Sequence, residues 1–191
     1  MPRQKEFNYE EKLTVARDIF WKKGYSATSM NDLENAMKIN RSSIYLTYGN
    51  KHELFIKSLN QYIQNKSKQY SEAVEKGSNP LESVKNIINS VFESAIIETS
   101  CLFTNSIYEL ALADKEVNKI LKKQTLSAVE QIETLLDKAK ENGSLKTEKS
   151  TRALAHFIVS GLASIYYNQI LFSDKKLTKQ SAEILFRSII K

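Results

Sequence analysis

The chain has 191 residues, a formal charge of +6 at pH 7 and 41% hydrophobic residues, a composition typical of a folded globule with a real core. No apolar run approaches the length of a membrane span, and the N-terminal residues MPRQKEFNYEEK lack the apolar segment of a signal peptide, so we expect a cytoplasmic protein with no membrane partner. The single cysteine, Cys101, excludes an internal disulfide and a cysteine-based structural metal site.

The sequence contains no grouping of residues typical of catalysis or metal binding. His52 and His156 lie far apart, and neither belongs to a cluster with ligand spacing. No glycine-rich phosphate loop or nucleophile elbow occurs. We therefore expect no enzyme, no cofactor and no metal site.

Apolar residues recur at intervals of three and four along the whole chain, which has only 2 prolines and 5 glycines. This period, with no alternating strand pattern, predicts an all-α fold of about nine helices. The first helix carries Leu13, Ala16 and Phe20 and ends at Gly24. The others are expected at about 30–37, 41–46, 51–76, 81–97, 101–114, 115–142, 150–172 and 178–190.

The segment from Gly24 to Lys51 carries two short helical patterns that meet at a tight turn. Thr28 or Ser29 can cap the first, because a hydroxyl there accepts a hydrogen bond from an unpaired backbone N–H. Asn40 can cap the second, in which Ile44 faces a core together with Tyr48 or Leu46. The residues left pointing outward are Arg41, Ser42, Ser43 and Tyr45. A short second helix with polar residues near its N-terminus indicates a helix-turn-helix that enters a DNA groove.

At this point the residues resemble a known family, the TetR (AcrR-like) transcriptional regulators. The matching positions keep the family's order and spacing over roughly fifty residues. They are Phe20, Gly24, Tyr25, Thr28, Ser29, Leu33, Ile39, Ser43, Ile44, Tyr45, Tyr48, Lys51 and Leu54. The resemblance implies an N-terminal DNA-binding domain at 1–50 and an effector-binding and dimerisation domain at 51–191, with the helix at about 51–76 connecting them.

The resemblance also implies roles for single residues. Thr28 and Ser29 would hold a phosphate, Arg41, Ser42 and Ser43 would face bases, and Tyr45 and Lys51 would grip the DNA backbone. Asn40 and Leu46 stand at variable positions of the family, and we place Asn40 among the DNA-binding residues. Simpler interpretations stay open: Thr28 only caps, Tyr45 is a half-buried core aromatic, and Leu46 touches a thymine methyl or nothing. Tyr48 is expected in the core, with its hydroxyl as an extra contact.

Charge agrees with this expectation. Residues 1–60 carry ten Lys and Arg against seven Asp and Glu, so half of the net charge lies in under a third of the chain. Arg3 and Lys5 stand on a basic leader that suits attraction to phosphates, although such charge is also ordinary solvated surface.

The last two predicted helices are the candidates for a dimer interface. The segment from Leu154 to Ile165 is apolar nearly all round, so more than one side must be buried. The expected interface residues are Leu154, Phe157, Ile158, Gly161, Leu162 and Ile165. Periodicity leaves open whether Gly161 faces a partner or the domain's own core; the family's four-helix dimer bundle favours the partner.

Residues 99–111 open with Thr99 or Ser100 as a possible cap before Cys101, and a helix N-terminus lowers the pKa of a thiol. The segment resembles the Cys-Leu-x-x-Asn stretch of one TetR subgroup, in which some members sense electrophiles through this cysteine. Two interpretations stay open for Cys101, a reactive sensor or a small buried hydrophobe. Asn105 is expected to bond the backbone or a neighbouring helix rather than a ligand.

The family implies a repressor that a small molecule releases from a palindromic operator as the connecting helix shifts. The candidate pocket residues, each of which core packing alone also explains, are Phe92, Ile96, Cys101, Phe103, Asn105, Tyr108 and Tyr166. A transcriptional activator of the same fold remains an alternative. So does a helical ligand-binding or scaffolding protein with a non-specific basic surface, which would bind any duplex equally.

Overall fold

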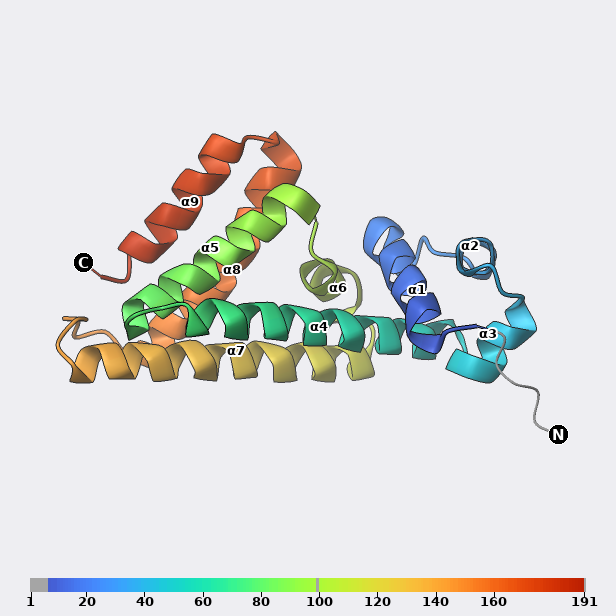
Figure 1. Cartoon of the computed structure of the whole chain (residues 1–191), viewed down its shortest axis with the longest axis horizontal. Coiled ribbons are helices and arrows are strands. Elements are labelled where there is room, and N and C mark those ends of the chain that lie inside the picture. The colour runs from blue at the N-terminus through green and yellow to red at the C-terminus, as the bar shows by residue number, and fades with distance from the viewer. Residues whose placement is uncertain (1–6, 99, 191) are drawn as a thin grey trace. The chain divides into compact units, whose positions relative to one another are not determined.

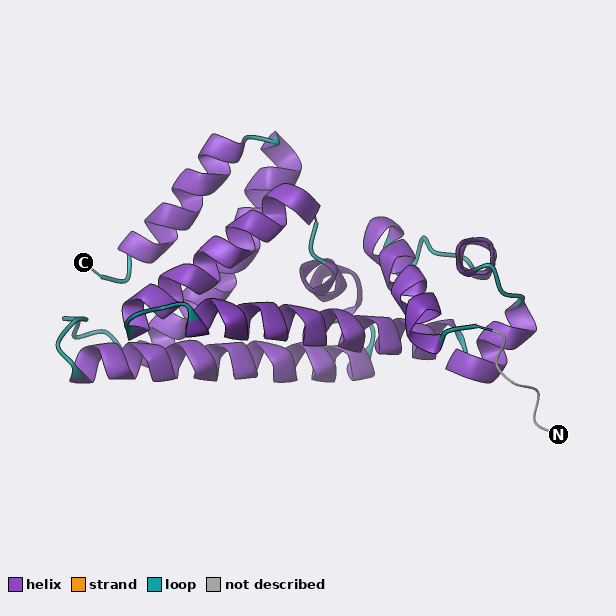
Figure 2. Ribbon diagram, viewed as in Figure 1, coloured by secondary structure: helices purple, strands orange, loops and turns teal. Residues whose placement is uncertain are grey.

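A computed structural model describes residues 7–98 and 100–190 of the chain (Figure 1). Within these ranges it contains nine helices and no strand, as Figure 2 shows by colour, and this confirms the all-α expectation. The helices are α1 (Tyr9–Lys23), α2 (Met30–Met37), α3 (Arg41–Tyr48), α4 (Lys51–Glu75), α5 (Pro80–Glu98), α6 (Leu102–Leu110), α7 (Lys115–Glu141), α8 (Thr151–Phe172) and α9 (Lys175–Arg187). In the same ranges no single helix is both long and apolar enough to cross a membrane.

Contacts divide the chain into two compact units. The first holds the chain up to Asn65 together with residues 102–118, so it contains α1, α2, α3, the first part of α4, α6 and the start of α7. The second holds residues 66–101 and the chain from Lys119 onward. No local sequence pattern indicates that α6, which lies far along the chain, groups with the N-terminal helices.

The first unit is built around α1. Asn8 begins this helix, because its side chain accepts hydrogen bonds from the backbone N–H groups of Glu10 and Glu11. Phe20 is fully buried and meets the ring of Phe55 on α4 edge-on, with centroids 5.1 Å apart. The helix ends at Gly24, whose φ of 80° is a conformation that favours glycine.

In the second unit α5, α8 and α9 lie side by side, as Figure 1 shows. Their facing sides are apolar, and Ile88, Ile158 and Leu185 are buried there. The last helix begins earlier than the expected residue 178. Asp174 is its N-cap and accepts hydrogen bonds from the N–H groups of Lys176 and Leu177, a local signal that the apolar period did not reveal.

Candidate nucleic-acid interface

Helices α2 and α3 form the predicted helix-turn-helix. Lys38 ends α2 in a left-handed conformation with φ 56°, and its N–H bonds the carbonyl of Glu34. Two residues later the Asn40 side chain accepts the N–H of Ser43 at 2.8 Å and so begins α3. Met37 and Ile44 are fully buried on the two sides of this turn. The turn is therefore set by local caps and by apolar burial together.

The outer side of α3 carries the residues expected to meet DNA. Arg41, Ser42 and Tyr45 are exposed, and Tyr45 keeps 47% of its surface. Leu46 beside them is 89% exposed. Ser43 is only half-buried, and its backbone is engaged by the cap Asn40. The N-terminal half of α3 thus offers a guanidinium, hydroxyls and a phenol.

Arg41 is oriented by α2. Its guanidinium lies 3.7 Å from the carboxylate of Glu34 and donates a hydrogen bond to the side chain of Asn31, and its backbone N–H bonds Glu34 Oε1 at 3.1 Å. These contacts restrict the rotamers of an exposed arginine before it meets a ligand. Asn31 and Glu34 were not predicted as partners of Arg41, because the pairing exists only once the turn brings α2 against α3.

Thr28 and Ser29 separate in role. Ser29 is the N-cap of α2 and forms a capping box with Asp32, whose pKa is held well below its usual value by hydrogen bonds from Lys23 and Ser29. Thr28 is 1% exposed, and its hydroxyl donates to the carbonyl of Gly24 at 2.6 Å. The expectation that the Thr28 side chain holds a phosphate is therefore corrected, because that side chain is buried and already engaged.

Tyr48 and Lys51 lie at the end of this motif. Tyr48 is 1% exposed, so it lies in the core as expected. Its hydroxyl donates to the carbonyl of Tyr9, which corrects the expectation that this hydroxyl makes an extra contact with DNA. Lys51 begins α4, and its Nζ lies 4.4 Å from the ring centroid of Tyr25. Arg3 and Lys5 of the expected basic leader lie outside the described residues.

This geometry agrees with two family models that together span most of the chain. Residues 13–57 match "Bacterial regulatory proteins, tetR family", and residues 57–185 match "Tetracyclin repressor-like, C-terminal domain". The chain belongs to the TetR family. It is a TetR-family transcriptional regulator, and residues 13–57 contain the helix-turn-helix described above.

Two known helix-turn-helix regulators resemble most of the chain. An uncharacterised helix-turn-helix regulator of Bacillus subtilis, YezE, is 29% identical over 191 residues, covering 96% of this chain and 92% of that protein. The repressor ComR of Escherichia coli is 24% identical over 160 residues, covering 82% and 76% of the two chains.

Solved structures of TetR regulators share the fold. A cysteine mutant of CifR complexed with 26-bp double-strand operator DNA superposes with a TM-score of 0.87 at 18% identity, covering 98% of this chain and 99% of that one. A TetR regulator from Chloroflexus aurantiacus gives 0.88 at 15% identity, covering 94% and 92%. At such identities the likeness describes the fold alone.

The expected effector residues of this TetR-family protein fall into both units. Phe103, Asn105 and Tyr108 lie on α6 in the first unit, where Tyr108 is 83% exposed. In the second unit Phe92 and Ile96 are half-buried on α5, whereas Cys101 and Tyr166 are buried. Cys101 precedes α6, which begins at Leu102, and the alternative cap Thr99 lies outside the described residues.

Tyr166 belongs to a buried polar cluster of the second unit that the sequence analysis missed. Its hydroxyl donates to Glu98 Oε2 at 3.2 Å, and burial raises its pKa well above the usual value. Glu98 also accepts two 2.7 Å bonds from Lys66, which bonds Ser94 at 3.1 Å. The cluster joins α4, α5 and α8, and every member finds a hydrogen-bond partner.

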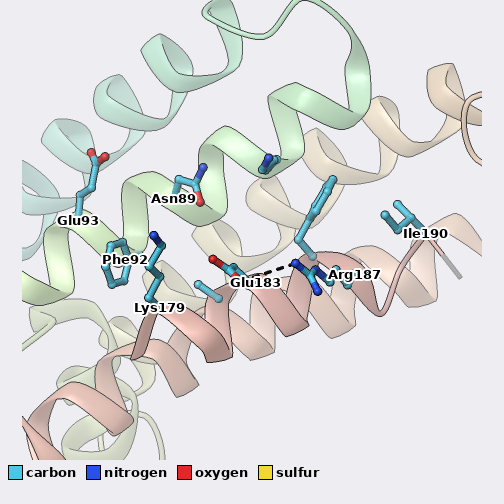
Figure 3. A pocket seen from close by; sticks show the side chains of 10 residues that line it. Asn89, Phe92, Glu93, Lys179, Glu183, Arg187 and Ile190 are labelled. Atoms are coloured by element: carbon cyan, nitrogen blue, oxygen red, sulfur yellow. Dashed lines mark ion pairs between the residues drawn. The ribbon is translucent and has the colours of Figure 1, made fainter. Parts of the chain in front are cut away.

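A groove of about 580 Å³ lies between α5 and α9 in the same unit (Figure 3). Phe92, Phe186 and Ile190 give it apolar walls, and Figure 3 shows Glu183 and Arg187 paired across one turn of α9, at 3.8 Å. Of the expected pocket residues only Phe92 lines it. Lysine, arginine and glutamate side chains all line the groove, so its charge does not indicate the class of ligand that would bind there.

The expected dimer residues on α8 face different ways. Leu154, Ile158 and Ile165 are buried within the single chain, and a Cβ on Gly161 would lie 2.5 Å from Leu185 Cδ1 of α9. Leu154, Ile158 and Ile165 therefore pack against their own chain, which corrects the expectation that they face a partner. Gly161 is half-buried beside Leu185 and stays a candidate for the interface. Leu162 is half-buried and Phe157 is 52% exposed. On α8 and α9 the exposed large apolar residues outside the expected set are Tyr167, Ile170, Leu171, Phe172 and Ile184.

Proposed function

We propose that this regulator is a repressor that binds a palindromic duplex operator as a homodimer and releases it when a small molecule binds. Its role is regulatory rather than catalytic, it uses no cofactor, and it acts where the DNA is, in the cytoplasm. The observation that carries the proposal is the exposed polar face at the start of α3, where Arg41, Ser42 and Tyr45 project from a helix fixed by its cap and by α2.

The side-chain chemistry of each residue on this face suggests which part of the DNA it contacts. Arg41 is suited to a guanine edge, because its guanidinium can donate two parallel hydrogen bonds to O6 and N7. Ser42 and Ser43 are short hydroxyl donors for other edges. We infer that Ser29, Asn40, Tyr45 and Lys51 contact phosphates, which fix the register of the protein on the duplex but do not read sequence. The CifR complexes, which hold 26-bp operator DNA, support a duplex as the ligand of this fold.

The exposed side of α8 supports a homodimer. Phe157, Tyr167 and Leu171 are exposed at helical spacing, and Ile184 is exposed on α9. A set of large apolar residues exposed together is typical of an interface. Two-fold symmetry would then present two copies of α3 to two half-sites of a palindrome.

The effector is expected to bind in the second unit. Phe92, Ile96, Cys101 and Tyr166 remain the candidates there, and the buried cluster of Lys66, Glu98 and Tyr166 supplies polar groups among apolar walls. Phe103, Asn105 and Tyr108 also remain candidates for effector binding, but they lie on α6 in the first unit. A small molecule that alters the position of α4 would change the spacing of the two α3 helices.

The decisive experiment is selection of duplexes from a random pool by the purified protein, followed by gel-shift titration with the Tyr45→Ala variant. We expect one short palindrome whose binding weakens steeply with salt, and loss of binding in the variant with its fold and dimer intact. A protein with a general basic surface would recover no common sequence. Transcription in vitro from a promoter carrying the palindrome then separates a repressor from an activator.

A further inference from the structure

A carboxylate from α6 holds the turn that leads into the helix-turn-helix. Glu109 Oε2 accepts the backbone N–H of Tyr25 at 2.9 Å, and Glu109 Oε1 accepts the N–H of Ser26 at 2.6 Å. The two donors are consecutive in the chain, so one carboxylate binds both in a bidentate manner. A Cβ on Gly24 would lie 3.0 Å from Glu109 Oε2, so the glycine leaves room for this close approach.

The turn held by Glu109 sets the start of α2. The Thr28 hydroxyl bonds the carbonyl of Gly24, and the Thr28 N–H bonds the carbonyl of Tyr25 at 3.3 Å. Ser29, which follows directly, is the N-cap of α2. Hydrogen bonds therefore connect the α6 carboxylate with the turn as far as Thr28, and the peptide bond from Thr28 to Ser29 joins the turn to the helix end that is proposed to bind a phosphate.

The ring of Tyr25 fastens the same turn to α4. It lies 5.0 Å from the ring of Phe55, centroid to centroid, and Lys51 Nζ lies above its face. Lys51 is proposed to grip the DNA backbone. The turn thus contacts elements on both sides of the recognition helix α3, at the start of α2 and at the start of α4.

Glu109 is ionised at neutral pH. Burial raises the pKa of its carboxyl, but the hydrogen bonds from Ser26 and Tyr25 and the charge of Lys51 outweigh burial and leave the pKa lowered. Bonds from N–H groups to an ionised carboxylate are about twice as strong as neutral ones. A negative charge also opposes association with a polyanion, so any benefit of Glu109 to DNA binding must come from position and not from charge.

We propose that Glu109 is a positioning residue for operator binding, which holds the turn at Gly24–Ser26 and through it the DNA-facing ends of α2 and α4. The inference rests on the proposed function. It means that the DNA-binding head is discontinuous in sequence, because the residue that fixes its first turn stands 84 positions after Tyr25.

The test compares Glu109→Gln and Glu109→Ala with Glu72→Gln in the full-length protein. Glutamine keeps the shape of the side chain and one of the two acceptor oxygens, whereas alanine removes the side chain beyond Cβ and both acceptors. Glu72 is an exposed carboxylate of α4 in the second unit, so Glu72→Gln makes the same charge change away from the turn. Operator affinity is titrated at several salt concentrations on the selected palindrome, and hydrogen exchange of peptides covering residues 24–30 is followed by mass spectrometry.

We expect Glu109→Gln to weaken operator binding about tenfold, Glu109→Ala to weaken it further, and residues 24–30 to exchange faster in both. The salt slope of binding stays that of the parent, because the bound complex keeps the same phosphate contacts and the loss of affinity comes from ordering the turn on binding. Neutralising a carboxylate otherwise tightens binding to a polyanion, so Glu72→Gln should bind as the parent or slightly more tightly. The direction of the effect therefore distinguishes position from charge.

Two results overturn the inference alone. In one, the parent binds its operator and Glu109→Gln binds it equally or more tightly. In the other, affinity falls together with faster exchange throughout the chain, which assigns Glu109 a general role in stability. A parent that selects no duplex overturns the proposed function, and this inference with it.

Discussion

The side-chain hydroxyl of Tyr48 donates a hydrogen bond of 2.8 Å to the backbone carbonyl of Tyr9, and the two rings stack with centroids 4.7 Å apart. This pair ties α3 to the first turn of α1. Tyr45 stands one turn earlier on the same helix and is exposed. Two tyrosines of one short helix therefore have opposite surroundings, and their roles can be separated.

Removing each hydroxyl should have a different effect. Tyr48→Phe loses its bond to Tyr9, and we expect the free energy of unfolding to fall by about 1 kcal/mol with unchanged operator affinity. Tyr45→Phe should keep its stability and lose roughly fivefold in operator affinity, because a phosphate contact disappears. Urea unfolding and gel-shift titration measure the two quantities. A larger loss of affinity in Tyr48→Phe would mean that its hydroxyl reaches DNA.

The apolar side of α8 should govern assembly. We expect Phe157→Glu to convert the dimer to monomers in sedimentation analysis, because it places a charge in an interface that excludes water. Operator affinity should fall as well, because a monomer binds a single half-site and loses the avidity of two linked sites. Leu112→Glu makes the same change at a fully exposed residue of the first unit and should leave the dimer intact. Monomers in the control and dimers in Phe157→Glu would place the interface elsewhere.

Gly161 should respond to Leu185 of its own chain. Gly161→Ala brings a methyl against Leu185 Cδ1, and we expect the free energy of unfolding to fall by about 1 kcal/mol from overpacking. In a Leu185→Ala background the same change should become stabilising by up to about 1 kcal/mol, because alanine favours helix. Urea unfolding of the four proteins gives this change of sign. An equal cost in both backgrounds would indicate that Gly161 contacts the partner subunit.

The ion pair of Lys66 and Glu98 should be costly to break on one side. Lys66→Met leaves the Glu98 carboxylate without its cation, and we expect a loss of about 2 kcal/mol in the free energy of unfolding. The loss is below that of a fully buried pair because the Glu98 side chain is 24% exposed. Lys68→Met, at an exposed position of α4, is the matched control. Adding Glu98→Gln to Lys66→Met should recover part of the loss, and no recovery would contradict an electrostatic cause.

Asp114 should make stability depend on pH. Burial raises the pKa of its carboxyl, but hydrogen bonds from Val117, His52 and Glu116 outweigh burial and hold the pKa below the ordinary 3.8. A carboxyl with a lowered folded pKa stabilises the protein above its unfolded pKa, and this contribution is lost as the pH falls through the folded value. Asp114→Asn should therefore be less stable than the parent near neutral pH, with the difference shrinking below pH 3.8.

Urea unfolding over a pH series measures this difference. Asp137→Asn, at an exposed carboxyl of α7, should match the parent at every pH. A difference between Asp114→Asn and the parent that persists unchanged in acid would assign the effect to packing instead of charge.

Local signals explain why the motif around α3 was predictable. The cap at Asn40 and the spacing of Ile44 and Tyr48 lie within one or two turns of each other, so a single sequence contains them whole. The apolar α8 was less informative. Nearly every position of Leu154–Ile165 is apolar, so its period could not say which side meets α5 and α9 and which side is exposed.

Long-range contacts had no such signal. No sequence pattern around Glu109 indicates that it contacts Tyr25, and none around Tyr48 indicates that its hydroxyl bonds the carbonyl of Tyr9. Thr28 illustrates the same limit, because its sequence position suits a phosphate contact as well as a buried bond to Gly24. Burial decided between the two.

The sequence by itself determined the helical fold, the helix-turn-helix and the polar character of the end of α3. These follow from periodicity and capping, which act over a few residues. Only the tertiary structure decided which hydroxyls are engaged inside, which apolar residues of α8 stay exposed, and which carboxylate holds the first turn of the head. Those outcomes depend on which distant helices pack together, and packing joins residues that the chain keeps apart.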